Sequence, residues 1–107
     1  MTPRQVNEKN PLLPLRKEID EIDAALIELL ARRLRLSTEI GQVKHLRGLA
    51  IQNSTREQQI LSRIEASPFD NSTRQSIASI YQEIFATSRN VQNKDSRVEE
   101  AADSNDV

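Results

Sequence analysis

The sequence contains no cysteine and a single histidine, His45. These absences exclude disulfide frameworks, thiol nucleophiles, Cys/His zinc sites and any triad that needs a second histidine. Charge of neither sign dominates, because 15 Lys and Arg face 16 Asp and Glu, so no sequence-wide attraction to nucleic acid or to an anionic membrane is expected. No apolar run is long enough to span a bilayer, and residues 1–15 lack the order of a signal peptide. We therefore expect a cytoplasmic protein with neither nucleic-acid nor membrane partners.

Glycine and proline are also scarce, with two and four residues respectively, and no segment alternates as a half-buried strand does. The chain is therefore predicted to be all-α. Its 107 residues are enough for one small domain and not for two. Residues 1–9 are polar, and residues 94–107 are acidic and rich in Ser, Asn and Asp. We expect both ends to be disordered and the domain to span residues 10–93.

The first predicted helix is unusually long and runs from about Pro14 to about Leu46. It measures about 50 Å, whereas a chain of this size has a radius of gyration of only about 13 Å. Because the chain cannot cover such a helix by itself, we expect the helix to pack against a second copy in an intertwined helical homodimer. Its stripe repeats in steps of four and three residues and consists of Leu15, Ile19, Ile22, Leu26, Leu29, Arg33, Leu36, Ile40 and Val43.

Two shorter helices are predicted to follow. The second begins near Ser54, where a capping-box spacing places Glu57 three residues on, and it ends before Pro68. The third begins near Ser72 with the same signature and fades near Gln92. Its apolar face carries Ile77, Ile80, Tyr81, Ile84 and Phe85.

Arg33 occupies a position of the stripe where an apolar side chain is expected. A buried guanidinium is costly unless an anion meets it. Lys44, eleven residues on, returns to within about 20° of the same helix face. Two cations on one face fit an anion-binding site, and an ion pair between Arg33 and an acid of the same or the partner helix fits equally well. The residues alone leave both interpretations open.

The other polar candidates have ordinary structural explanations. Arg16 is typical of an exposed helix start, and Glu57 has the position of a capping-box acid. Ser88 and Gln92 form a polar pair one turn apart near a helix end, and His45 adjoins another end as a surface or dipole partner. No metal-ligand cluster, phosphate-binding glycine loop or pair of nucleophile and base is present in the sequence. We therefore expect neither metal nor cofactor, and no covalent chemistry.

Taken together, these residues resemble a known family, the all-helical chorismate mutases of the AroQ type, which also form the first domain of bifunctional chorismate mutase–prephenate dehydratases. The resemblance covers residues 10–92 and is carried by the segments NPLLPLRKEIDEIDAALIELLARRLRLSTEIGQVK, STRE and YQEIFATSRNVQ. Asn53 departs from the pattern, because well-known bacterial members have an aspartate there near the substrate hydroxyl; we expect a changed affinity rather than a lost activity. The residues that match the family's site are Arg16, Arg33, Lys44, Arg56, Glu57, Ser88 and Gln92.

The resemblance implies an activity, the intramolecular Claisen rearrangement of chorismate to prephenate in the biosynthesis of phenylalanine and tyrosine. It implies that Arg33 and Arg16 of the partner subunit each bind one carboxylate of chorismate, so that the homodimer shares its active sites. Lys44 and Gln92 are implied to stabilise the negative charge that develops on the ether oxygen. This reaction needs no proton transfer, which agrees with the lack of a nucleophile and a base.

The resemblance assigns roles to four further residues. Glu57 is implied to accept a hydrogen bond from the ring hydroxyl, with Asn53 close by. Arg56 is implied to orient Glu57 or to add positive potential, and Ser88 is implied to donate to a carboxylate. The catalytic set would then be Lys44, Gln92 and Glu57.

The sequence leaves two alternative functions open. An isochorismate pyruvate-lyase on the same fold needs the same dicarboxylate clamp and could use the same lysine. The Arg56-Glu57 pair and Gln92 favour the mutase over the lyase. A catalytically silent dimerisation or regulatory module, whose arginines bind an anionic effector, is the second alternative; the match at nearly every site position argues against it.

Overall fold

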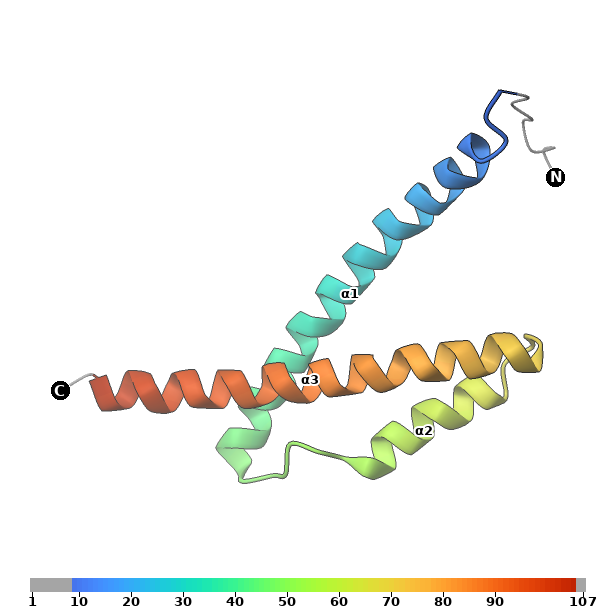
Figure 1. Ribbon diagram of the computed structural model, residues 1–107. Coiled ribbons are helices and arrows are strands. Elements are labelled where there is room, and N and C mark those ends of the chain that lie inside the picture. Colours follow the sequence, from blue (N-terminus) through green and yellow to red (C-terminus); the bar gives the residue numbers. More distant parts are fainter. Residues whose placement is uncertain (1–8, 106–107) are drawn as a thin grey trace. The chain divides into compact units, whose positions relative to one another are not determined.

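The computed structural model describes residues 9–105, and the side chains of residues 9–94. This part of the chain contains three helices and no strand: α1 is Leu13–Arg47, α2 is Ser54–Glu65 and α3 is Asn71–Asn105 (Figure 1). The predicted all-α class is confirmed. Residues 1–8 and 106–107, which belong to the two ends expected to be disordered, lie outside the described residues.

The chain divides into two units, one up to Arg33 and one from Leu34 onward. The first unit contains the N-terminal part of α1. The second unit contains the rest of α1 together with α2 and α3, and in it α2 lies along the first half of α3 (Figure 1). None of the described helices is long and apolar enough to cross a membrane.

The length of α3 differs from the prediction. The sequence predicts one very long helix and two shorter ones, with the third fading near Gln92, but α3 has 35 residues, as many as α1. The prediction was wrong because it weighed only the loss of large apolar residues after Gln92. The segment 93–105 has no glycine or proline, and its Arg, Glu and Ala residues have high helix propensity. The expected disorder of residues 94–107 stays a prediction.

Helix α1 ends in a glycine-dependent turn. The N–H of Gly48 donates to the carbonyl of His45 at 3.3 Å, and the N–H of Leu49 donates to the carbonyl of Lys44 at 2.8 Å. These two bonds form a Schellman motif, which needs a left-handed residue at its centre. Gly48 supplies it with φ = 65°, a conformation that L side chains rarely adopt. The turn directs the chain toward α2.

The caps of α2 and α3 lie earlier in the sequence than the capping-box spacings predict. Asn53, not Ser54, caps α2, and its Oδ1 accepts from the N–H of Arg56 at 3.0 Å. Asp70, not Ser72, caps α3, and its Oδ1 accepts from the N–H of Thr73 at 2.7 Å. Asn and Asp cap as well as Ser does, so each helix begins one or two residues sooner. Glu57 therefore has no capping role.

The core of the second unit is centred on α3, which carries the one buried apolar side chain among the described residues. Phe85 is 3% exposed, and its ring meets that of Tyr81 edge to face at a centroid distance of 5.7 Å. Ile77 and Ile84 are half-buried on the same face of α3. Ile80, which the sequence predicts on this face, is instead 60% exposed.

The apolar stripe of α1 is exposed in the single chain. Its eight apolar members have exposed fractions between 39% and 57%, whereas Arg33 is half-buried. Exposed apolar side chains that repeat along one face of a helix are typical of a surface that packs against another helix. The exposed members are Leu15, Ile19, Ile22, Leu26, Leu29, Leu36, Ile40 and Val43.

Candidate active site

In the second unit, α1 and α3 meet through small and polar residues. A Cβ placed on Gly41 would lie 2.8 Å from the Cα of Gln92, closer than real Cβ contacts come, so only glycine allows this approach. One turn earlier on both helices, Ser37 donates to the Oγ of Ser88 at 3.2 Å. Ser37, Ser88 and Gln92 are 5%, 8% and 7% exposed. Buried polar side chains are normally hydrogen-bonded, and here Ser37 and Ser88 satisfy this by bonding each other.

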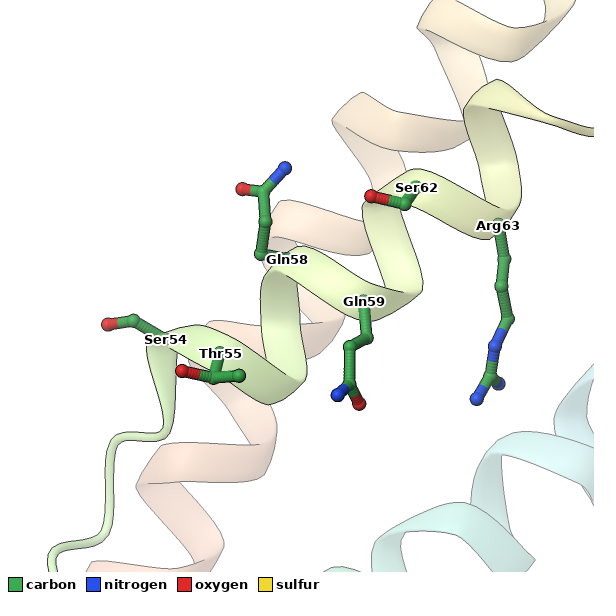
Figure 2. Close-up of a pocket in the computed structure, with 6 residues that line it drawn as sticks. All are labelled: Ser54, Thr55, Gln58, Gln59, Ser62 and Arg63. Carbon is green, nitrogen blue, oxygen red and sulfur yellow. The ribbon is translucent and has the colours of Figure 1, made fainter.

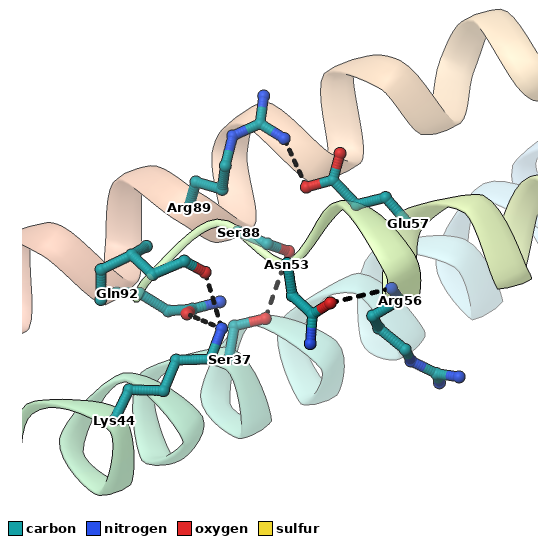
Figure 3. A network of polar contacts seen from close by, with 9 residues as sticks. Ser37, Lys44, Asn53, Arg56, Glu57, Ser88, Arg89 and Gln92 are labelled. Carbon is teal, nitrogen blue, oxygen red and sulfur yellow. Dashed lines mark hydrogen bonds and ion pairs between the residues drawn. The ribbon is translucent and has the colours of Figure 1, made fainter. Parts of the chain in front are cut away.

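Lys44 is the cation of this contact. Its Nζ donates to the backbone carbonyl of Ile51 at 2.6 Å and to the Oε1 of Gln92 at 3.0 Å (Figure 3). An ammonium has three N–H donors, so these two bonds leave one donor for a ligand. The bond from Lys44 also fixes the amide of Gln92, because its carbonyl oxygen must face the ammonium. The amide nitrogen of Gln92, a donor, then faces the other way.

Glu57 lies where α2 faces α3 and forms an ion pair with Arg89. The Nη1 of Arg89 is 2.6 Å from the Oε2 of Glu57, and the two side chains are 32% and 21% exposed (Figure 3). A short charge-assisted bond between partly buried groups is stronger than a solvated surface pair. The guanidinium that contacts Glu57 is thus that of Arg89, whereas the Nη1 of Arg56 donates to the Oε1 of Gln59 at 3.4 Å.

Of the eight residues that the sequence assigns to the site, the second unit contains six: Lys44, Asn53, Arg56, Glu57, Ser88 and Gln92. Lys44 and Gln92 are in direct contact, and Ser88 lies one turn before Gln92 on α3 and accepts a hydrogen bond from Ser37. The side-chain oxygen of Asn53 is used to cap α2. The remaining two, Arg16 and Arg33, lie on the part of α1 that belongs to the first unit. Arg16 is exposed and Arg33 is half-buried.

Three groups of this network are absent from the sequence-based prediction. Ser37 follows Arg33 by four residues and precedes Lys44 by seven, so the helical repeat that relates these two cations also contains Ser37 and could have identified it. The carbonyl of Ile51 and the guanidinium of Arg89 carry no such signal. Both depend on where a turn or a second helix lies, and a repeat along one helix does not report that.

The chemistry available here is that of fixed hydrogen-bond donors and charges. An ammonium, an amide and two hydroxyls lie together, and a carboxylate lies beside an arginine. Across the described part of the chain, no three His, Asp or Glu side chains gather as metal ligands. Such a set can bind an anion and can stabilise charge that develops on an oxygen, because the donors are already held by the protein.

A hollow of about 750 Å³ lies elsewhere, on the surface of α2 (Figure 2). All its lining residues come from this one helix, and none of them belongs to the predicted site. Figure 2 shows polar side chains that spread from the helix without converging on a common point. We assign it no role in the site; its lining consists of Ser54, Thr55, Gln58, Gln59, Ser62 and Arg63.

Comparison with known proteins places most of the chain in one family. Residues 15–93 match the family described as chorismate mutase type II. The T-protein of Haemophilus influenzae is 47% identical over 57 residues, which are 51% of this chain and 15% of that protein. The bifunctional chorismate mutase/prephenate dehydratase of Escherichia coli K12 is 39% identical over 56 residues, 52% of this chain and 14% of that protein.

A shorter relative is the chorismate mutase of Methanocaldococcus jannaschii, 38% identical over 53 residues, which are 50% of this chain and 54% of that protein. The matched part of the chain thus spans about half of this relative and about one-seventh of the two longer ones. The family match itself extends over about three-quarters of the chain and includes every residue of the candidate site. The chain therefore belongs to the chorismate mutase type II family.

Proposed function

We propose that this chain catalyses the rearrangement of chorismate to prephenate, a step toward phenylalanine and tyrosine. The observation that carries the proposal is the contact of 3.0 Å between the Lys44 ammonium and the amide of a buried Gln92. Membership of the chorismate mutase type II family supports it, and so does the similarity to the chorismate mutase of Methanocaldococcus jannaschii. The reaction breaks a C–O bond as a C–C bond forms, and it needs no proton transfer.

Lys44 and Gln92 would act on the ether oxygen of chorismate. Negative charge develops on this oxygen as the C–O bond lengthens, so donors that already point at it stabilise the transition state more than the ground state. The third N–H of Lys44 and the amide nitrogen of Gln92 are such donors. Their positions are fixed before substrate binds, since Lys44 is held by the carbonyl of Ile51 and itself holds the amide of Gln92.

The remaining site residues would bind and orient the substrate. Chorismate is a dicarboxylate, and two arginines, Arg33 and Arg16 of the partner subunit, would each bind one carboxylate in a bidentate manner. Clamping both carboxylates holds the enolpyruvyl arm over the ring, which lowers the entropic part of the barrier. Ser88 would donate to a carboxylate. Glu57 would accept a hydrogen bond from the ring hydroxyl, with Asn53 near it and Arg56 adding positive potential.

A shared site requires a dimer, and the stripe on α1 supports one. Eight Leu, Ile and Val side chains repeat along the helix and are each at least 39% exposed in the single chain. Their spacing in steps of three and four is that of a helix which packs lengthwise against another helix. We therefore propose that α1 pairs with α1 of a second copy in an intertwined homodimer.

The proposal is tested by incubating the purified chain with chorismate and measuring prephenate formation. We expect Lys44→Ala to lower kcat by about 10²- to 10³-fold, as loss of a donor to a developing oxyanion typically does. Lys44→Arg should rescue little, because a planar guanidinium does not replace a compact ammonium. Lys94→Ala, which removes an exposed lysine on α3, is the matched control and should leave kcat unchanged.

Three outcomes would contradict the proposal. If the wild-type chain does not convert chorismate, it is not a chorismate mutase. Formation of salicylate from isochorismate in a parallel incubation would favour the lyase instead. Turnover that Lys44→Ala leaves intact would remove Lys44 from the reaction.

A further inference from the structure

The ion pair between Glu57 and Arg89 joins α2 to α3 at the edge of the candidate site. Nη1 of Arg89 lies 2.6 Å from Oε2 of Glu57, and both side chains are at least two-thirds buried. The second carboxylate oxygen, Oε1, accepts no hydrogen bond from any group among residues 9–94. One oxygen of Glu57 is therefore held by the protein, and the other is available as an acceptor.

We infer that Arg89 is a positioning residue, which holds Glu57 so that its second carboxylate oxygen accepts the hydroxyl of the substrate. This inference rests on the proposed function. A glutamate side chain has three rotatable torsions, and a carboxylate that is free to rotate loses entropy when it binds a ligand. The bond from Arg89 fixes the side chain in advance. The hydrogen bond from the substrate hydroxyl to Glu57 then forms without a further loss of side-chain entropy.

Charge gives Arg89 a second effect on the same carboxylate. The proposed substrate carries two negative charges, and an uncompensated carboxylate inside its site would repel it. The guanidinium of Arg89 offsets the charge of Glu57 at a distance of 2.6 Å. Glu57 can then present an acceptor oxygen to a hydroxyl without adding net negative charge to the site. Arg56 does not supply this charge at contact distance, since its guanidinium bonds Gln59 instead.

A hydroxyl that is bound equally in the ground state and in the transition state affects KM rather than kcat. We therefore expect Arg89→Ala to raise the KM for chorismate by about tenfold, in the range for loss of a bond to a charged group, with kcat within about twofold of wild type. Arg89→Lys retains the positive charge and should recover part of the loss. Arg63→Ala removes an exposed arginine on α2 and serves as the matched control, with KM unchanged.

A double-mutant cycle tests whether Arg89 acts through Glu57, and the melting temperature measured beside it separates positioning from a purely structural ion pair. If Arg89 acts through Glu57, Arg89→Ala has no further effect on KM once Glu57→Gln is present. A purely structural ion pair is non-additive as well, but its loss lowers the melting temperature and kcat and leaves KM unchanged. Should Arg89→Ala fail to fold, Arg89→Lys and Arg89→Gln complete the cycle.

The outcomes distinguish this inference from the function on which it rests. A wild-type chain without chorismate turnover overturns both. With an active wild type, multiplicative effects in the cycle overturn only the role of Arg89. A lower KM in Arg89→Ala overturns the positioning role as well, because the ion pair with Arg89 would then hinder the binding of substrate to Glu57.

Discussion

The chemistry of Gln92 can be changed with almost no change in the shape of its side chain. Gln92→Glu replaces the amide by a carboxyl group beside Lys44 and, in the proposed site, beside the ether oxygen. An ionised carboxylate repels the developing negative charge, whereas a protonated one can donate to it. We expect the variant to lose activity at neutral pH and to regain part of it as the pH falls.

The check is the pH profile of kcat/KM for the variant against wild type. The wild-type amide does not ionise, so the wild-type chain should show no comparable gain on the acid side. An identical profile in both proteins would mean that Gln92 does not face the ether oxygen.

The two glycines offer a matched pair of substitutions. In Gly41→Ala the new Cβ would lie 2.8 Å from the Cα of Gln92, and backbone cannot yield as a flexible side chain can, so α3 must shift. We expect kcat to fall by about tenfold or more, although alanine favours the helix by about 1 kcal/mol. Gly48→Ala meets nothing within 4 Å but forces a side chain to φ = 65°.

For Gly48→Ala we therefore expect the opposite pattern, a stability loss of about 1 to 2 kcal/mol with kcat retained below the melting transition. Thermal unfolding and turnover measured on both variants give the comparison. Full activity in Gly41→Ala would refute the claim that the close approach of α1 and α3 sets the geometry of the site.

Single residues of the site are predictable from the sequence only where the repeat along one helix places them. Arg33 and Lys44 could be placed on one face from the helical repeat, because a cation on an apolar stripe is conspicuous. Arg89 could not, because its partner Glu57 lies 32 residues away and on another helix. The resemblance assigns Asn53 to the substrate hydroxyl. Its role as the cap of α2 is not predictable, because Asn53 and Ser54 are adjacent and either residue type can cap a helix.

The N-terminal cap of α3 is ionisable and that of α2 is not, so their contributions to stability depend differently on pH. Hydrogen bonds from the side chain and the backbone N–H of Thr73 hold the pKa of Asp70 below its ordinary value of 3.8. Since the pKa is lower in the folded chain, the carboxylate stabilises the fold above the unfolded-state pKa, and this contribution is lost as the pH falls through the folded-state value. The cap of α2 is the neutral amide of Asn53, which does not titrate.

We therefore expect the difference in melting temperature between wild type and Asp70→Asn to shrink as the pH falls below about 4. Asn53→Ala should cost about 1 kcal/mol by loss of a cap, and the same amount at each pH. Thermal melts of the three proteins across the acid range test this. A constant difference for Asp70→Asn would show that the bonds to Thr73 do not depend on the charge of Asp70.

Helix α1 was predictable in both its bounds, and α3 in only one. The apolar stripe of α1 persists to its last turns, and Gly48 then ends the helix. The end of the apolar repeat and the position of the helix-ending glycine therefore indicate the same boundary. In α3 the apolar face stops near Gln92, but the backbone continues to Asn105. Loss of an apolar face indicates where packing ends, whereas the end of a helix depends on propensity and on breakers, of which this segment has none.

The proposed homodimer predicts that two defective chains can complement each other. Arg16→Ala removes a residue that each chain would lend to its partner, and Lys44→Ala removes one that each chain keeps. A mixed dimer contains one site with both lesions and one site with neither. We expect mixing of the two inactive variants, with subunit exchange, to restore part of the wild-type activity.

Sedimentation must accompany this experiment, since it reports whether mixed dimers form. A monomer at micromolar concentration would contradict the dimer itself. Verified heterodimers without activity would contradict the shared site while leaving the dimer intact.

Lys44 is tied at both of its ends to the turn that follows α1. Its backbone carbonyl accepts from the N–H of Leu49, and its ammonium donates to the carbonyl of Ile51, so side chain and main chain close a ring around residues 44–51. Loops between helices usually tolerate insertions and deletions at little energetic cost. This one should not, because a single added or deleted residue would move the acceptor away from the ammonium. Changes in loop length are therefore restricted here by the chemistry of the site rather than by the stability of the fold.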